Sequence, residues 1–379
     1  NTLMKVAIFG GTFNPVHNEH INIVKAAIRS LALDKVIIMP SNVTPAKSGR
    51  MLADSADRLN MCKIAFASVP KAEVSDFEIT RSGISYSYIT CQRFAEEYPD
   101  CERYFIVGGD MLENFDSWKF PEKILQCVNL AVCAREDGAK LKKAKDDFYT
   151  RFGVHAVSFD YIGKNVSSTK IRVLAALGEG VSDCVGNGVA EYIKRNSLYL
   201  LDGAQQVKKS LSEYRWRHTV GVAVKAAENC TKYNVTERDA VTAALYHDCA
   251  KELPRGGEAE QAVPEGVPSP VVHQFTGAYL AERVYGVKDK NILDAIRYHC
   301  SGRANMTPLE KLVYLADMVE EGRDYDGVEE LREIFKQNKE EAFNRAIERH
   351  VRHLEVSGLP VYGLTQKAYE YAKEHKNDK

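Results

Sequence analysis

The chain has 379 residues, of which 45% are apolar and 27% charged, and its formal net charge is −1. A chain of this length and mixture predicts two ordinary globular domains. The charge balance argues against nucleic acid or an anionic membrane as a partner, and no apolar run reaches the roughly 20 residues that a membrane span needs. Nine cysteines without a CxxC pair indicate reduced thiols, so we expect a cytoplasmic protein.

Strands and helices are predicted to alternate over the first two hundred residues. Short apolar runs predict strands at 5–10, 35–40, 72–79, 103–109, 129–135 and 155–162. Apolar residues at helical spacing predict helices at 20–31, 57–69, 87–98 and 121–127. This alternation predicts an α/β fold, a doubly wound parallel sheet, over residues 1–202. Ligands of such sheets bind at the carboxyl ends of the strands.

The pattern changes after about Leu201, where no convincing strand remains. The segment 202–210 reads as a polar turn, and a Gly/Pro-rich loop covers 254–270. Helices are predicted at 217–233, 237–253, 274–286, 290–300 and 308–321, with two more near the end. We therefore expect a second, all-α domain over residues 203–379.

The segment "GGTFNPVHNEH" joins the first predicted strand to the first helix. Gly10 and Gly11 let the backbone approach a ligand closely, and a helix N-terminus favours phosphate. Two histidines, His17 and His20, lie on one side of the first helical turn, where each could donate to a phosphate oxygen. A lone histidine here would be a surface or cap residue, but the pair behind two glycines favours a nucleotide site.

A second segment, "GKNVSSTKIR", places three hydroxyls at the start of a helix: Ser167, Ser168 and Thr169. On their own these side chains are best read as helix N-caps. Combined with the histidine turn, they suggest the far side of a triphosphate site.

Both segments resemble the (H/T)xGH and ISSTxxR signatures of the nucleotidyltransferase superfamily. Residues 77–90, 105–125 and 189–199 are similar to segments of the bacterial nicotinate-nucleotide adenylyltransferases, and the resemblance covers about residues 4–200. It implies that the phosphate of nicotinate mononucleotide attacks the α-phosphorus of ATP in the presence of Mg²⁺, by positioning and charge stabilisation.

The resemblance also implies roles for individual residues. His17 and His20 would bind the ATP phosphates and steady the transition state. Ser168, Thr169 and Arg172 would hold the β and γ phosphates. The remaining candidate ligand contacts are Gly10, Gly11, Thr12, Phe13 and Ser167 around the nucleotide, Lys47 on substrate phosphate, and Asp110 and Trp118 on the acceptor. Trp118 could equally be a core residue.

Glu19 departs from the pattern, which has glycine at this position. A carboxylate in the first helical turn stabilises the helix by about 0.3–1 kcal/mol through the macrodipole. It also brings negative charge and bulk to the phosphate site, so an inward orientation would weaken ATP binding. We expect the side chain to face solvent, and Glu19→Gly to leave the KM for ATP nearly unchanged.

Histidines and aspartates recur through the helical half. His247 and Asp248 are adjacent and predicted on one helix, and residues that differ by about 100° around a helix can lean toward one ion. Imidazole and carboxylate ligands suit Fe, Mn or Zn rather than Ca. The full candidate set is His218, His247, Asp248, His273, His299 and Asp317, enough for two metals bridged by a carboxylate.

This H…HD…H…H…D order resembles the HD-domain metallophosphohydrolases. Residues 217–223, 246–254 and 296–334 are most similar to the bacterial symmetrical diadenosine-tetraphosphate hydrolases, which carry a di-iron centre. The resemblance covers about residues 205–370 and implies metal-assisted hydrolysis to two ADP. Lys251, one turn after Asp248, would hold a phosphate, and Arg323 and Asp324 resemble substrate-side residues, although both could be solvated loop charges.

The sequence thus predicts a bifunctional enzyme that uses ATP, nicotinate mononucleotide and diadenosine tetraphosphate. Two alternatives stay open: the helical domain is a nucleotide sensor without turnover, or Glu19 leaves the first domain a weakened nucleotide binder. Transfer to another acceptor such as phosphopantetheine is disfavoured, because the flat ring of Trp118 suits a pyridine better. The metal, the choice between nicotinate and nicotinamide, and assembly into a homo-oligomer stay open.

Overall fold

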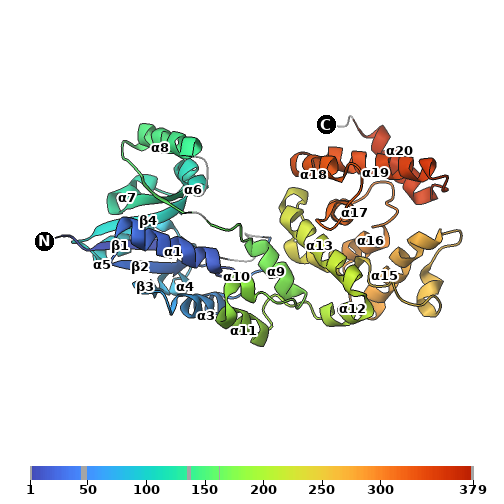
Figure 1. The fold of residues 1–379 in the computed structure, drawn as a ribbon, viewed down its shortest axis with the longest axis horizontal. Helices are drawn as coiled ribbons and strands as arrows, with labels where there is room; N and C mark the ends of the chain where they lie inside the picture. Colours follow the sequence, from blue (N-terminus) through green and yellow to red (C-terminus); the bar gives the residue numbers. More distant parts are fainter. Residues whose placement is uncertain (1, 44–48, 135–137, 162, 377–379) are drawn as a thin grey trace. The chain divides into compact units, whose positions relative to one another are not determined.

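The computed structural model describes residues 2–43, 49–134, 138–161 and 163–376. The chain divides into two compact units (Figure 1). The sheet unit comprises Asn1–Ser48, Leu52–Ile171 and Gly180–Ser197, and the helical unit comprises Gly49–Met51, Arg172–Glu179 and Leu198–Lys379. The domain boundary after residue 202 stays a prediction. Lys47, the candidate for substrate phosphate, lies outside the described residues.

Six parallel strands form one sheet within the described part of the sheet unit, in the order β3-β2-β1-β4-β5-β6. They are β1 (Lys5–Gly11), β2 (Lys35–Pro40), β3 (Ala72–Val74), β4 (Glu102–Gly108), β5 (Asn129–Ala134) and β6 (Val157–Asp160). The strand order reverses between β1 and β4, and ligands of doubly wound sheets bind at this switch point.

Helices connect the strands of the sheet unit. They are α1 (Asn18–Leu31), α3 (Ser55–Phe66), α4 (Phe77–Thr80), α5 (Ser87–Glu97), α6 (Gly109–Glu113), α7 (Pro121–Cys127), α8 (Gly138–Phe152), α10 (Ser182–Val185) and α11 (Asn187–Arg195), with a 3₁₀ turn at Phe115–Ser117. The strand predicted at 72–79 was wrong in its second half, because β3 ends at Val74 and α4 follows. The few apolar residues of this segment fit a strand and a single helical turn equally well, so the sequence pattern does not distinguish the two.

The core of the sheet unit is built from alternate residues of the central strands. Val6 and Ile8 of β1 and Phe105 and Val107 of β4 pack on one face, with residues of α5, α7 and α8. The intervening strand residues, such as Ala7, are buried as well. Both faces of the sheet are therefore covered, as the unbroken apolar runs predict.

The described part of the helical unit contains helices and short 3₁₀ turns but no strand. The helices are α12 (Ala204–Ser210), α13 (Glu213–Asn229), α14 (Glu237–His247), α15 (Val272–Arg283), α16 (Lys290–Arg297), α17 (Pro308–Val319), α18 (Val328–Gln337), α19 (Lys339–Val356) and α20 (Gly363–Glu374). Another helix, α9 (Ser168–Ala176), begins in the sheet unit and continues into the helical unit.

Two local predictions for the helical half were wrong. The segment 202–210 is not a turn, because α12 forms there and buries Ala204 and Val207 against the unit. Asp248 is not within a helix but is the C-cap of α14, which ends at His247. Among the described residues, no helix has both the length and the apolar character that crossing a membrane requires.

Candidate functional site

The paired histidines form the N-terminus of α1. His17 is the N-cap, and its backbone N–H donates to His20 Nδ1 at 3.0 Å. The two rings stack with their centroids 3.7 Å apart. Because Nδ1 of His20 accepts a hydrogen bond, the neutral ring carries its proton on Nε2 and can donate there to an anionic oxygen.

A cavity of about 620 Å³ opens at the carboxyl ends of β1 and β4. Gly10, Gly11 and His20 line one part of it, and Gly108, Gly109 and Asp110 line another. The structure thus brings the glycine turn, one histidine and the predicted acceptor residue Asp110 around one space. Trp118 is half-buried and packs against Phe105 and Phe115, with ring centroids 5.8 and 5.3 Å away.

A buried arginine that the sequence did not single out holds the turn after β1. Arg58 Nη1 donates to the carbonyl oxygens of Thr12 and Ser41, each at 2.8 Å, and its Nε donates to Ala53 O at 3.1 Å. Phe13, the other candidate in this turn, is buried with a positive φ of 49°. An arginine among the apolar residues of a predicted helix can indicate a buried structural arginine. The sequence did not indicate which carbonyl oxygens would accept its hydrogen bonds.

The hydroxyl segment precedes and opens α9. Ser167 Oγ accepts a hydrogen bond from the Lys170 backbone N–H at 3.3 Å. This is the N-cap contact predicted for these hydroxyls when they are considered on their own. Ser168 and Thr169 form the first residues of the helix and are half-buried.

Arg172, one turn further along α9, is 1% exposed and forms a bidentate ion pair in the helical unit. Its Nε lies 2.7 Å from Glu237 Oε1, and its Nη2 lies 2.9 Å from Glu237 Oε2. Its predicted contact with the β and γ phosphates stays a prediction. The ion pair joins residues 65 positions apart in the chain, and the sequence gives no signal for it.

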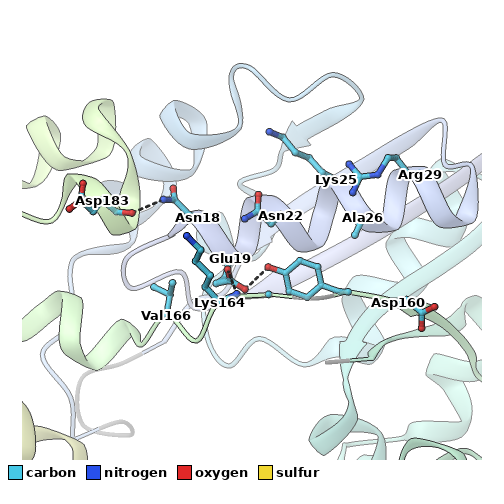
Figure 2. A pocket seen from close by; sticks show the side chains of 12 residues that line it. Asn18, Glu19, Asn22, Lys25, Ala26, Arg29, Asp160, Lys164, Val166 and Asp183 are labelled. Carbon is cyan, nitrogen blue, oxygen red and sulfur yellow. Dashed lines mark hydrogen bonds between the residues drawn. The ribbon is translucent and has the colours of Figure 1, made fainter. Parts of the chain in front are cut away.

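Glu19 does not face solvent, so the expected orientation was wrong. The side chain is 3% exposed, and its carboxylate lies beneath the first turn of α1 toward the segment that carries Lys164 (Figure 2). The Tyr161 hydroxyl donates to Glu19 Oε2, and the Lys164 backbone N–H donates to Oε1 at 3.1 Å. These two donors compensate the cost of burying the carboxylate, which a reading of α1 alone could not foresee.

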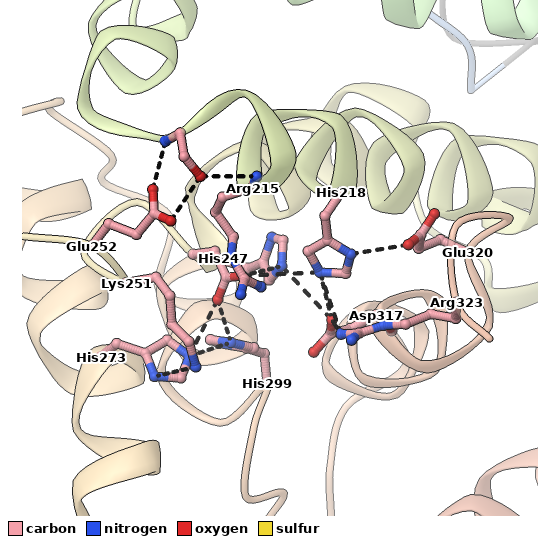
Figure 3. Close-up of polar contacts among 12 residues, drawn as sticks. Arg215, His218, His247, Lys251, Glu252, His273, His299, Asp317, Glu320 and Arg323 are labelled. Atoms are coloured by element: carbon pink, nitrogen blue, oxygen red, sulfur yellow. Dashed lines mark hydrogen bonds and ion pairs between the residues drawn. The ribbon is translucent and has the colours of Figure 1, made fainter. Parts of the chain in front are cut away.

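The six candidate ligands of the helical unit converge on one centre (Figure 3). The Asp248 carboxylate lies at its middle. Asp248 Oδ1 is 3.2 Å from His273 Nε2 and 3.4 Å from His299 Nε2. Asp248 Oδ2 is 3.5 Å from His247 Nε2 and 3.9 Å from His218 Nε2. One carboxylate therefore faces two pairs of imidazoles, one with each oxygen, as a carboxylate that bridges two metals would.

Asp317 adds a second carboxylate to the pair formed by His218 and His247. Its Oδ1 lies 2.8 Å from His218 Nε2 and 4.0 Å from His247 Nε2. The residue is carried by α17, whose N-terminus is fixed by a capping box: Thr307 Oγ accepts from the Glu310 N–H, and the Glu310 carboxylate accepts from the Thr307 N–H.

Local hydrogen bonds orient the imidazoles toward the centre. His247 Nδ1 is 2.6 Å from Ala244 O, and His299 Nδ1 is 2.7 Å from Ile296 O. Since a carbonyl oxygen only accepts, each Nδ1 carries the proton and each Nε2 is left with a lone pair. The buried Nε2 of His247 has no hydrogen-bond partner in the described chain. A metal ion is the partner that such a lone pair fits.

The electrostatics of the centre also suit a cation. Burial lowers the pKa of His247 to about 4, so the ring is neutral at pH 7, as a ligand must be. Burial alone would also lower the pKa of His218, but hydrogen bonds with Asp317 and Glu320 outweigh it and raise the pKa to about 9. The protein therefore favours a positive charge between His218 and these carboxylates.

Buried thiols flank the centre without joining its ligand set. Burial raises the pKa of Cys249 and of Cys300 to about 12, and neither thiol belongs to the groups of converging ligand atoms in the described chain. The donor set consists of imidazole nitrogens and carboxylate oxygens, which suits Fe, Mn or Zn and not Ca.

Charged side chains surround the centre, and some escaped sequence reasoning. Arg215 Nη1 lies 3.0 Å from Asp248 Oδ2, and Glu320 Oε1 lies 3.1 Å from His218 Nδ1. Each stands three residues from a ligand on the same helical face, a spacing that could have identified both. The predicted Lys251 has its Nζ 3.4 Å from His273 Nδ1.

Of the two predicted loop residues, one reaches the centre. Arg323 Nη2 lies 2.7 Å from Asp317 Oδ1. Asp324 is exposed, and in the described chain we observe no contact between it and a candidate metal ligand. Its substrate-side role stays a prediction.

Comparison with known proteins assigns each unit. The family model described as Cytidylyltransferase-like matches residues 8–174, and the HD domain model matches residues 215–322. A Mycoplasma genitalium protein named "Probable nicotinate-nucleotide adenylyltransferase/Ap4A hydrolase" is 30% identical over 353 residues, which cover 89% of this chain and 95% of that protein. The chain belongs to this bifunctional family.

Other relatives match one half of the chain. A Clostridium tetani protein named "Probable nicotinate-nucleotide adenylyltransferase" is 34% identical over 199 residues, covering 52% of this chain and all of that protein. A Clostridium acetobutylicum protein with a crystal structure, titled "predicted HD superfamily hydrolase involved in NAD metabolism", is 30% identical. The match covers 45% of this chain and 95% of that one, with a TM-score of 0.41.

Membership of the adenylyltransferase/Ap4A hydrolase family confirms the predicted fold class and the prediction of a bifunctional enzyme. HD domains bind divalent metal, and the six converging histidine and aspartate side chains of the helical unit provide a place for it.

Proposed function

We propose that the sheet unit transfers the adenylyl group of ATP to nicotinate mononucleotide, giving deamido-NAD and pyrophosphate with Mg²⁺ as the ATP counter-ion. The proposal rests on the cavity at the carboxyl ends of β1 and β4, where His20 and Asp110 share one space. His17 and His20 would donate to the phosphates and to the charge that develops in the transition state. Asp110 would bind the acceptor.

We further propose that the helical unit hydrolyses diadenosine tetraphosphate to two ADP at a centre of two metals, with iron as the metal. The convergence of four imidazoles on the Asp248 carboxylate supports this proposal. The metals would supply Lewis-acid polarisation of a phosphoryl oxygen. Lys251 and Arg323, at the edge of the centre, would bind the phosphates that flank the bond to be cleaved.

One set of assays tests both proposals. Purified protein is supplied with ATP and either nicotinate or nicotinamide mononucleotide, and separately with diadenosine tetraphosphate, while its metal content is measured. We expect deamido-NAD from nicotinate mononucleotide, ADP as the product of hydrolysis, and two iron ions per chain. A His20→Ala variant should lose transfer and keep hydrolysis. A protein with no stoichiometric metal and no hydrolysis would instead be a nucleotide sensor in its helical half.

Glu320→Ala should lower metal affinity or hydrolysis by about 10- to 100-fold, the usual effect of removing a carboxylate that orients a ligating histidine. Glu320 holds His218 Nδ1 at 3.1 Å and is itself held by the Gly322 N–H at 2.7 Å. Titration of the apo-protein with iron, followed by hydrolysis assays, measures the change.

Glu321→Ala is the matched control, since its side chain is 77% exposed and pairs only with Lys225 among the contacts observed in the described chain. Equal losses in the two variants would contradict an orienting role for Glu320.

A further inference from the structure

Glu19 occupies a place that joins the two phosphate-binding segments of the sheet unit. It lies in the first turn of α1, between His17 and His20, and its carboxylate is buried. Both oxygens accept hydrogen bonds from the segment that follows β6: Oε2 from the Tyr161 hydroxyl and Oε1 from the Lys164 N–H (Figure 2). We call these three residues the carboxylate clamp.

The local sequence is adapted to the clamp. A Cβ on Gly163 would collide with the Glu19 carboxylate and with the Tyr161 ring, so a larger residue there would displace one of the two partners. The glycine at position 163 thus leaves the space that the hydrogen bond between Glu19 and Tyr161 requires. The small residue at position 163 is therefore consistent with a specific contact between Glu19 and Tyr161.

The segment held by the clamp leads directly into the hydroxyl residues. Lys164 is followed within a few residues by Ser167, which caps α9, and by Ser168 and Thr169. A clamp at Lys164 therefore limits how far these hydroxyls can move from the histidine turn. The α1 N-terminus adds to this arrangement, because its dipole favours a carboxylate in the first turn.

We propose that Glu19 is a positioning residue for adenylyl transfer, which holds the Ser167–Thr169 hydroxyls in register with His17 and His20. The inference rests on the proposed function of the sheet unit. It gives the Glu19 carboxylate, which stands where the (H/T)xGH signature has glycine, a positive role in catalysis in place of an obstructing one. A small displacement of a group that positions reactants lowers the reaction rate by a large factor. Breaking the clamp should therefore lower the measured rate of adenylyl transfer.

The test compares Glu19→Ala, Glu19→Gln and Tyr161→Phe in steady-state assays of adenylyl transfer with ATP varied. We expect Glu19→Ala to lower kcat/KM for ATP by about 10- to 100-fold, the range typical of losing a carboxylate that orients other groups. Glu19→Gln keeps an acceptor oxygen and should stay within about 3-fold of wild type. Asn22→Ala, an exposed change one turn further along α1, is the matched control.

A double-mutant cycle separates positioning from a general loss of stability. Because Glu19→Ala and Tyr161→Phe break the same clamp, their effects on kcat/KM should be strongly non-additive. Hydrolysis by the helical unit, measured on the same samples, should not change and corrects for the amount of intact chain, while circular dichroism establishes that the sheet unit is folded. Additive effects, or a Glu19→Ala enzyme as active as wild type or more active, would overturn the inference. If the wild-type protein transfers no adenylyl group at all, the proposed function fails and the positioning role fails with it.

Discussion

We expect Asp248→Ala to abolish the proposed hydrolysis of diadenosine tetraphosphate and to leave the proposed adenylyl transfer intact. The Asp248 carboxylate faces His218 and His247 with one oxygen and His273 and His299 with the other. Its removal would therefore take a ligand from each of the two candidate metal positions. A metal Lewis acid supplies several kcal/mol of transition-state stabilisation, so the rate should fall on the order of 1000-fold or more. Elemental analysis of the purified variant should show the loss of metal alongside the loss of hydrolysis.

Two controls accompany this variant. Asp202→Asn removes an exposed carboxylate from the same unit and should keep both activities. Circular dichroism establishes that the Asp248→Ala protein is folded. A folded variant that loses both activities would contradict two independent sites, and one that retains metal and hydrolysis would contradict the bridging role of Asp248.

The main elements and the convergence of the six candidate ligands could be predicted because their signals are local or repeated. Apolar runs predicted the strands of the parallel sheet, with β3 shortened, and helical spacing predicted the main helices of the second unit. The six metal-ligand candidates could be selected because the chain has only ten histidines, and because the adjacent His247 and Asp248 and the order of the others match a known pattern. The helix of residues 204–210 was missed because most of its residues are polar. Only Ala204 and Val207 are buried, which is too few to give an apolar pattern at helical spacing.

The orientation of charged side chains could not be predicted in the same way. Glu19 has a local reason to face solvent, yet its partners Tyr161 and Lys164 lie more than 140 positions away. Their hydrogen bonds, not the dipole of α1, decide the burial. Arg172 was read from its motif alone, whereas its carboxylate partner Glu237 lies on a helix with no related motif. Buried polar contacts depend on tertiary structure, and a pattern along the chain does not contain them.

Glu237→Ala should lower the free energy of unfolding of the helical unit by about 3–5 kcal/mol, because it leaves the Arg172 guanidinium buried without its counter-charge. Both side chains are almost fully buried, and the pair is bidentate. Urea unfolding in a Trp118→Phe background measures the change. Trp216 is then the one remaining tryptophan, and its indole donates to Glu179 in the helical unit.

The double variant Arg172→Met with Glu237→Leu is the informative control, since replacing a buried ion pair by apolar residues of similar size is often neutral or stabilising. We expect it to unfold near the wild-type urea concentration, while Glu237→Ala unfolds far below it. A Glu237→Ala protein within about 1 kcal/mol of wild type would contradict a buried, uncompensated arginine. If the single variant is unstable and the double is not, the ion pair adds little net stability. The loss in Glu237→Ala would then be the penalty of an unpaired buried guanidinium and not the net contribution of the ion pair.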